Sequence, residues 1–387
     1  MIDKILWWCP TPWETDGGAI VTFYQMREMN QQHPEITNHL IPKVWSQADQ
    51  TKLPYCKFHK VTTKYFGQVP NEIPKIMKRE QIKLLVLFHI PWEYFPIVDK
   101  VHNIGGKVVN WQTIHWINDV LFLSDKLQDF DWWIPPTRYA METLVGVGGL
   151  SKDRMTVIPH GVDTSYFFPH DTNELRNNLG IKPDQKMILF VGRCQLTKGI
   201  IPMILTARKL CNDFDCHVVF KAGVHDGVWK AREMAHLLHK MTMWDSRIHF
   251  LTDWTTPSFM EELTAACDIL VCPSGHEGFS LPPLEAMACK KPVAITDIPV
   301  HRELLGGKNG VCGLLMPPFM STEYVNDVQM VTVPSDDMIY GSVKYLLENP
   351  DEAKIMGENG LNRAKQYYDL REVCKQWFSL LNGKLEE

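Results

Sequence analysis

The stretch DILVCPSGHEGFSLPPLEAM, residues 268–287, sets a buried strand, a turn and the start of a helix in succession. Its apolar run ILVC contains no alternating polar residue, which is typical of a parallel strand covered on both faces. Glycine, serine and two prolines follow, and proline is well tolerated in the first turn of a helix. The stretch therefore predicts a β-loop-α unit, the building block of an open parallel sheet.

The same unit recurs along the chain and is interrupted once. Strand-like runs in the first half are KILWWC, HLIPKVW, LLVLFH, KVVNWQT, WWIPP and MTVIPH, and those in the second half are MILFVGR, HVVFKAG, RIHFL, DILVCPS, KPVAITD and CGLLMPP. Helical patterns lie between the runs, and residues 160–186 carry turn residues. Because 387 residues exceed a single core, we expect an α/β protein with two doubly wound, Rossmann-like domains, residues 1–170 and 171–364, that face a cleft. A helical, partly apolar tail from about residue 350 to 381 could cover either domain.

The composition of the chain limits the classes of function and the locations that we expect. A net charge of −5 gives no general electrostatic reason to bind nucleic acid. The ten cysteines are scattered without a C-x-x-C pair, so we expect reduced, buried thiols. The first ten residues, MIDKILWWCP, hold too short an apolar run for a signal peptide, and no run approaches the ~20 apolar residues of a membrane span. We therefore expect a cytoplasmic protein.

Ligands of open α/β sheets lie beyond the carboxyl ends of the strands, so the loops that follow strands matter most. In the first such loop, Gly17 and Gly18 precede a helix-like segment and could receive a phosphate or a sugar. A plain tight turn is the alternative, and the pair is no G-x-G-x-x-G fingerprint. In VGRCQLTKG, Arg193 ends a strand and Lys198 precedes a helix. These two cations could clamp a diphosphate or remain solvated.

The opening stretch adds two carboxylates to these cations. Glu277 lies on the loop after the strand, and Glu285 lies about one turn into the helix. Free N–H groups of the first turn can hold phosphate oxygens. Because carboxylates would repel phosphates, we expect both glutamates to accept hydrogen bonds from sugar hydroxyls, one at each end of a nucleotide sugar. The alternative is an acidic helix start that complements the helix dipole.

Taken in order, these loops resemble the motifs of glycosyltransferase family four, a large group of two-domain retaining transferases. VGRCQLTKG is similar to the family's arginine and lysine motif, and residues 277–285 match its E-x7-E motif. Gly17 and Gly18 resemble its N-terminal glycine loop. His115, in TIHW, stands where the family often has a histidine, and HGVD at residues 160–163 resembles its interdomain segment. The resemblance spans nearly the whole chain.

The resemblance implies a GT-B fold, with the donor bound mainly by the second domain and the acceptor mainly by the first. Residues from about 365 to 387 would form a helix that packs back on the first domain. Backbone amides of residues 278–280 would bind phosphate or sugar oxygens. Catalysis would retain the anomeric configuration without an enzyme nucleophile, through charge stabilisation and positioning.

The resemblance also implies roles for single residues. Arg193 and Lys198 would stabilise the departing diphosphate, and His115 would lie near the transferred sugar. Glu277 would contact the donor hexose and Glu285 the ribose. The implied donor-binding residues are Gly17, Gly18, Arg193, Lys198, Glu277, Gly278, Phe279, Ser280, Leu281 and Glu285.

Neither a metal ion nor a cofactor is expected. The two D-x-D patterns, residues 129–131 and 213–215, precede strands, which is the wrong end of the sheet for a ligand. No H-E-x-x-H or comparable histidine spacing occurs in the sequence. On the proposed acceptor side, Trp13 and Trp116 lie in loops after strands, where each could stack on a sugar ring or belong to the core.

Residues 71–83, NEIPKIMKREQIK, combine four cations with apolar residues. Such a helix could rest on an anionic membrane, but we favour an ordinary amphipathic helix packed on the sheet.

We therefore expect a retaining glycosyltransferase that moves a hexose, with glucose or mannose favoured, from a UDP- or GDP-linked sugar to a carbohydrate or glycolipid acceptor. A nucleotide-sugar epimerase or a sugar phosphorylase of the same fold, and a non-catalytic carbohydrate-binding protein, are the alternatives.

Overall fold

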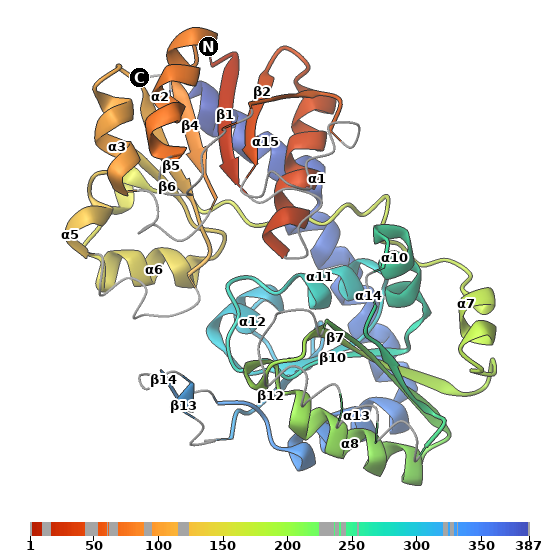
Figure 1. Cartoon of the computed structure of the whole chain (residues 1–387). Coiled ribbons are helices and arrows are strands. Elements are labelled where there is room, and N and C mark those ends of the chain that lie inside the picture. Colours follow the sequence, from red (N-terminus) through yellow and green to blue (C-terminus); the bar gives the residue numbers. More distant parts are fainter. Residues whose placement is uncertain are drawn as a thin grey trace. The chain divides into compact units, whose positions relative to one another are not determined.

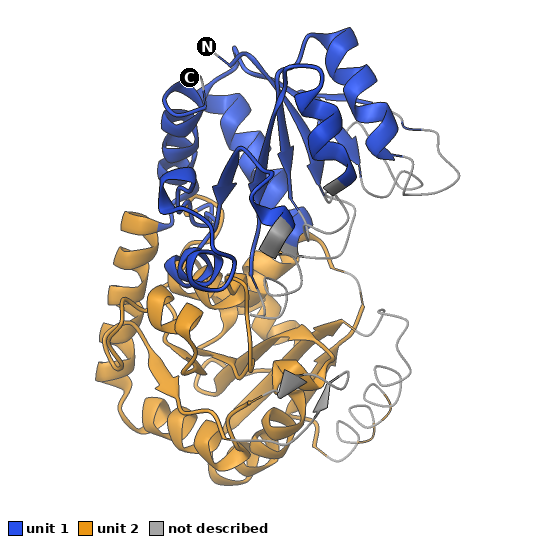
Figure 2. Ribbon diagram, turned by 90° about the vertical axis from the view of Figure 1, so that its left-hand side faces the viewer, with its two compact units in different colours: residues 1–163, 368–387 blue, residues 164–367 orange. Residues whose placement is uncertain are grey.

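The structure is a computed structural model of the chain (Figure 1), and it describes residues 2–9, 17–42, 53–59, 61, 69–88, 95–114, 124–223, 236, 240, 245–253, 255–319, 324–325, 329–330 and 332–385. The chain divides into two compact units (Figure 2). Unit 1 holds Met1–Asp163 and Tyr368–Glu387, and unit 2 holds Thr164–Tyr367. The sequence places these boundaries at residues 170 and 364.

Unit 1 is built on a parallel sheet of six strands in the spatial order β3-β2-β1-β4-β5-β6. The strands are β1 (Lys4–Cys9), β2 (Thr37–Pro42), β3 (Cys56–Phe58), β4 (Leu84–Leu87), β5 (Lys107–Trp111) and β6 (Trp132–Ile134). Cross-strand register aligns Trp8 with Leu87, Leu87 with Asn110, and Asn110 with Trp133. Because aligned residues of parallel strands share a face, this row crosses one face of the sheet near its carboxyl edge.

Helices cover both faces of this sheet. They are α1 (Gly17–Gln32), α2 (Val69–Glu80), α3 (Phe95–His102), α5 (Ser124–Leu127), α6 (Arg138–Gly146), the short 3-10 turn η5 (Lys152–Arg154) and α15 (Leu370–Asn382). On one face, α2 buries Ile73 and Met77 in the core of the unit. The apolar stripe of α2 is therefore used by the fold itself. On the other face, Trp377 of α15 packs on Trp7 and Trp111, with ring centroids 5.6 and 4.9 Å apart.

One expected strand of unit 1 does not form. The run MTVIPH lies beside β6, and the amides of Thr156 and Ile158 donate to the carbonyls of Trp133 and Pro135. A single bridge, between Trp133 and Met155, is all that results. The two prolines that follow β6 have no N–H groups, so the ladder lacks its returning hydrogen bonds. The prediction of a strand at MTVIPH was wrong for this reason.

Unit 2 repeats the plan with the order β12-β11-β10-β7-β8-β9, again with every strand parallel to its neighbours. The strands are β7 (Lys186–Arg193), β8 (Cys216–Gly223), β9 (Ile248–Leu251), β10 (Ile269–Cys272), β11 (Val293–Thr296) and β12 (Leu314–Met316), and β13 (Tyr324–Val325) pairs with β14 (Gln329–Met330) apart from the sheet. The helices are α7 (Asn173–Asn178), the 3-10 turn η6 (Leu196–Lys198), α8 (Ile200–Asp213), α10 (Pro257–Ala266), α11 (Leu281–Ala288), α12 (Pro299–Leu304), α13 (Asp336–Glu348) and α14 (Pro350–Tyr367).

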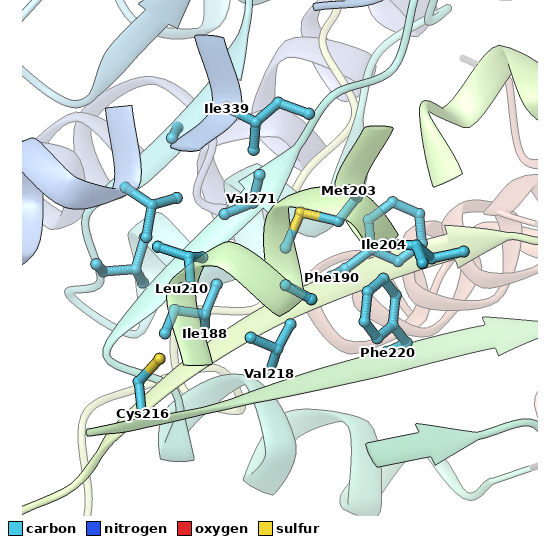
Figure 3. Packing of buried hydrophobic residues seen from close by; sticks show 14 of the residues in the cluster. Ile188, Phe190, Met203, Ile204, Leu210, Cys216, Val218, Phe220, Val271 and Ile339 are labelled. Atoms are coloured by element: carbon cyan, nitrogen blue, oxygen red, sulfur yellow. The ribbon is translucent and has the colours of Figure 1, made fainter. Parts of the chain in front are cut away.

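The core of unit 2 forms where α8 and α13 cover the sheet. Ile188 and Phe190 of β7 and Phe220 of β8 face Met203 of α8 and Ile339 of α13 (Figure 3), and all five side chains are buried. The helical tail is shared between the units, since α14 packs on α11 in unit 2 and α15 packs on α1 in unit 1. No helix in the described part of the chain is long and apolar enough to cross a membrane.

Strand order decides where a ligand can bind in each unit. Numbered within their own units, both sheets have the order 3-2-1-4-5-6 of a doubly wound Rossmann fold, which confirms the expected fold class. The order reverses between β1 and β4 in unit 1 and between β7 and β10 in unit 2. Ligands of such sheets bind outside the carboxyl ends of these paired strands. In unit 2 these ends carry residues 194–199 and 273–280.

Candidate functional site

The loop after β7 carries the two predicted cations. Arg193 is the last residue of β7 and is exposed. Lys198 ends the turn η6, and Gly199 follows in the left-handed conformation with φ of 68°. A Cβ at Gly199 would overlap the carbonyl oxygen of Pro273, so only glycine fits between the two loops.

The loop after β10 is tied to this first loop. The amide of Gly275 donates to the carbonyl of Thr197 at 2.8 Å. The ammonium group of Lys198 lies 2.7 Å from Oε1 of Glu277, and the two side chains are only 15% and 13% exposed. The adjacent strands β7 and β10 thus bring together two residues that the sequence assigns to different parts of the ligand.

This ion pair fixes the charge state of Glu277. Burial favours the neutral acid, but the charge and hydrogen bond of Lys198 outweigh it and hold the pKa of Glu277 at about 2. Ser274, which the sequence analysis missed, also donates to this carboxyl. Glu277 is therefore a carboxylate at neutral pH. It can accept hydrogen bonds but cannot act as a proton donor.

The start of α11 leaves its nearest backbone amides without partners inside the helix. Pro282 and Pro283 occupy the second and third helical positions and have no N–H groups to offer. The donors that remain are Gly278, Ser280 and Leu281, and none of the three amides has a hydrogen-bond partner among the described residues. Gly278 and Ser280 are buried. Because an unpaired buried N–H is costly, these amides point to a ligand that supplies acceptor oxygens.

Three further residues complete the site in unit 2. Glu285 lies one turn into α11, where burial raises its pKa to about 7. Phe279 is 5% exposed and fills the loop from within. His301 of α12, a second residue that the sequence analysis missed, reaches the hydroxyl of Ser280. The only sequence signal for His301 was its place in the segment after the strand KPVAITD.

The predicted residues of unit 1 are described only in part. Gly17 begins α1, and the carbonyl of Gly18 accepts a hydrogen bond from Thr22. Trp13, His115 and Trp116 lie outside the described residues.

The sequence analysis did not anticipate two buried side-chain amides at the carboxyl end of β5. Asn110 is fully buried, and within the described ranges neither its Oδ1 nor its Nδ2 finds a partner. Gln112, two residues on along the same face, is 5% exposed with an unpaired Oε1.

The D-x-D patterns lie at the amino ends of strands. Asp131 directly precedes β6 and accepts hydrogen bonds from the Val108 amide and from His102. Asp213 accepts from the hydroxyl of Tyr340. Within the residues that the structure describes, no three histidine, cysteine, aspartate or glutamate side chains are placed to hold one metal ion.

Comparisons with known proteins bear on the whole arrangement. The family described as glycosyl transferases group 1 matches residues 171–363, about half of the chain and nearly all of unit 2. Alpha-maltose-1-phosphate synthase from Mycolicibacterium smegmatis is 24% identical over 231 residues, or 59% of this chain and 56% of that protein. The chain thus matches about half the length of such curated relatives.

Two solved structures are similar over almost the full length. A glycosyltransferase from Rickettsia africae has a TM-score of 0.79 at 14% identity, with 99% of both chains covered. Anabaena Alr3699/HepE, in complex with UDP and glucose, has a TM-score of 0.77 at 16% identity, with 98% of this chain and 99% of that chain covered. These likenesses establish the fold of two Rossmann-like domains.

Proposed function

Because the chain belongs to the glycosyl transferases group 1 family, we propose that it transfers a hexose from a nucleoside diphosphate sugar to a carbohydrate or glycolipid acceptor. The observation that carries the proposal is the buried set of unpaired amides at Gly278 and Ser280 beside the Lys198–Glu277 ion pair. Donors and a fixed cation suit a diphosphate, and a carboxylate held ionised suits sugar hydroxyls.

The chemistry follows from these charges. In the transfer step, the bond between C1 of the sugar and the diphosphate oxygen breaks, and the acceptor hydroxyl oxygen forms a bond to C1 on the same face. The proton of that hydroxyl passes to the departing diphosphate. Arg193 and Lys198 stabilise the negative charge that grows on the leaving group, and this preorganised stabilisation lowers the barrier. The reaction retains the anomeric configuration and requires no metal ion.

Glu277 and Glu285 bind the two sugars of the donor. With Oε1 committed to Lys198, Glu277 presents its second oxygen to hydroxyls of the hexose. Glu285, one turn into α11, accepts from the hydroxyls of the ribose. Leu281 completes the donor site through its backbone amide, and Phe279 lies buried in the same loop.

The acceptor side belongs to unit 1. We assign Gly17 and Gly18 to the edge of the donor, His115 to the neighbourhood of the transferred sugar, and Trp13 and Trp116 to stacking on the acceptor. The location we expect is the cytoplasm.

A uridine nucleotide and glucose are the first candidates for the donor. Support comes from the similar Anabaena protein, whose structure holds UDP and glucose. Guanosine diphosphate sugars and mannose remain the next candidates to test.

A thermal-shift panel tests the donor site. UDP, GDP and ADP and their glucose or mannose derivatives are added to the wild type and to the Arg193→Ala, Lys198→Ala double variant. Ligand at about 100 times its Kd stabilises the folded state by about 2.7 kcal/mol, so one nucleotide should raise the wild-type Tm and leave the double variant unchanged. Lys209→Ala is the matched control, because Lys209 pairs with Asp336 on the surface of the same unit.

Two results would contradict the proposal. The donor assignment fails if no nucleotide raises the Tm of the wild type. It fails equally if the double variant responds as the wild type does.

A further inference from the structure

Ser280 has a backbone conformation that its side chain disfavours. Its φ and ψ are 79° and 76°, in the left-handed region, where a residue other than glycine is strained. Only three residues other than glycine have a positive φ in the described part of the chain. A strained residue persists only where its surroundings hold it in place.

The usual reason for a serine at this position does not apply. A serine before a helix normally accepts a hydrogen bond from the amide of the second or third helical residue. Here those residues are Pro282 and Pro283, which have no N–H, and the Ser280 side chain makes no capping bond. The hydroxyl is therefore available for another partner.

That partner is His301. Its Nε2 lies 3.0 Å from Oγ of Ser280, and its Nδ1 lies 2.8 Å from the carbonyl oxygen of Thr296. A carbonyl can only accept, so Nδ1 carries the hydrogen, and Nε2 of the neutral ring must accept the hydroxyl proton of Ser280. Burial lowers the pKa of His301 to about 4, so the neutral form is the one present at pH 7.

The hydrogen-bonded chain from the Thr296 carbonyl through His301 to the Ser280 hydroxyl, called the relay below, is enclosed in protein. His301 is fully buried and Ser280 is 5% exposed, so neither side chain bonds to bulk water. The thiol of Cys272 lies 3.7 Å from Oγ of Ser280, as a second neighbour of the hydroxyl. The relay joins α12, which follows β11, to the loop that follows β10.

We propose that His301 is a positioning residue of the donor site, which acts through the hydroxyl of Ser280 to hold the turn that presents the amides of Gly278, Ser280 and Leu281. The inference rests on the proposed function, because it concerns the diphosphate contacts of that same site. His301 itself touches no substrate. Its direction of hydrogen bonding, set by Thr296, is what keeps Ser280 in the left-handed conformation.

A double-mutant cycle tests the relay. His301→Phe keeps a ring but removes the acceptor, and Ser280→Gly removes both the hydroxyl and the strain of a positive φ. We expect His301→Phe to raise the Kd for the nucleotide that wild type binds by roughly tenfold, the effect of losing one buried hydrogen bond. In the Ser280→Gly background the same change should raise it less than about threefold, because glycine needs no hydrogen bond to adopt this conformation.

Two comparisons separate positioning from packing. His301→Gln supplies an amide oxygen near the place of Nε2, so its Kd should lie closer to the wild-type value than that of His301→Phe. His217, a buried histidine near the amino end of β8, is the matched control. His217→Phe should lower the Tm without ligand but leave the nucleotide Kd unchanged. Titration calorimetry gives the Kd, and thermal unfolding without ligand gives the Tm.

The outcomes are distinct. If His301→Phe weakens binding equally with Ser280 and with Gly at position 280, the histidine acts through packing and the inference is overturned. Wild-type affinity in His301→Phe would overturn it as well. If the wild type binds no nucleotide, the proposed function fails first and the inference falls with it.

Discussion

The ammonium group of Lys198 and the carboxylate of Glu277 lie 2.7 Å apart, although 79 positions separate them in the chain. Strands β7 and β10 are neighbours at the point where the strand order of unit 2 reverses, so their following loops meet there. The pair resolves the apparent conflict of a carboxylate beside the proposed diphosphate site, because Lys198 neutralises the charge of Glu277. Loss of Lys198 would leave a buried negative charge aimed at the ligand.

We predict that Lys198→Ala lowers kcat/KM for the nucleotide sugar by about 10²-fold or more, the effect of losing one preorganised charge. Adding Glu277→Gln should recover part of the lost donor affinity, since the repelling carboxylate is removed. Steady-state kinetics and donor Kd values check both parts. A kcat/KM in Lys198→Ala equal to the wild-type value would exclude Lys198 from the mechanism.

The same pair should contribute to stability. Removing one partner of a buried pair leaves an uncompensated charge, so Lys198→Ala should lower the free energy of unfolding by about 3 kcal/mol. Lys209→Ala, which breaks an exposed ion pair, should lower it by less than about 1 kcal/mol. Urea unfolding measures both values, and equal losses in the two variants would show that the Lys198–Glu277 pair behaves as a surface pair.

Donor affinity should depend on pH through Glu285. Burial raises the pKa of this carboxyl to about 7, and the contact that we propose with the ribose hydroxyls uses its ionised form as the acceptor. Affinity should therefore be highest above pH 7 and fall up to about tenfold per pH unit below it. The nucleotide sugar is the right probe, because its diphosphate diester does not titrate in this range. Glu285→Gln should bind more weakly and give a flat profile, whereas a flat wild-type profile would refute the role.

Gly199 should tolerate no side chain. Gly199→Ala adds a Cβ that overlaps the carbonyl oxygen of Pro273 at a φ of 68°, so the loop with Lys198 must shift. Gly180→Ala is the matched control, since Gly180 has a φ of 72° but open space around it. We expect about 1 kcal/mol of destabilisation at Gly180 from strain alone, and a larger loss together with weaker donor binding at Gly199. Similar behaviour of the two variants would contradict the coupling of the loops.

Unit 1 should lose stability in mild acid. His59, 4% exposed, shares a hydrogen bond with His39 at 2.8 Å, and burial lowers its pKa from 6.5 to about 4. The unfolded chain therefore binds the proton more readily between these values, and stability falls as the pH drops from 6.5 to 4, by up to about 3 kcal/mol. Tryptophan fluorescence during urea unfolding at several pH values follows this loss. His59→Gln should flatten the dependence, and an unchanged slope would exclude His59 as its source.

The sequence predicted the sheet and the loops for a physical reason. Strands covered on both faces must be apolar throughout, so runs such as ILVC can be identified in the sequence as strands. The loops that bind ligands follow the carboxyl ends of such strands. It also assigned Lys198 and Glu277 to the donor. It could not place them in contact, because that depends on which strands become neighbours.

His301 was beyond sequence reasoning for a similar reason. Its partner Ser280 lies on a different loop, and the need for a partner arises only from the left-handed turn before Pro282 and Pro283. The missing strand at MTVIPH, by contrast, could have been anticipated. The run faces two prolines that cannot return its hydrogen bonds.

The acceptor dependence of nucleotide release tests the proposed hexose transfer. The protein is incubated with UDP-glucose or GDP-mannose, with and without a panel of sugar, sugar phosphate and glycolipid acceptors, and the free nucleoside diphosphate and the anomeric configuration of the product are measured. We expect release of the nucleotide that requires an acceptor, is lost in Arg193→Ala and yields a product with the anomeric configuration of the donor. Conversion of the nucleotide sugar without acceptor, turnover that requires inorganic phosphate, or an inverted product would contradict it.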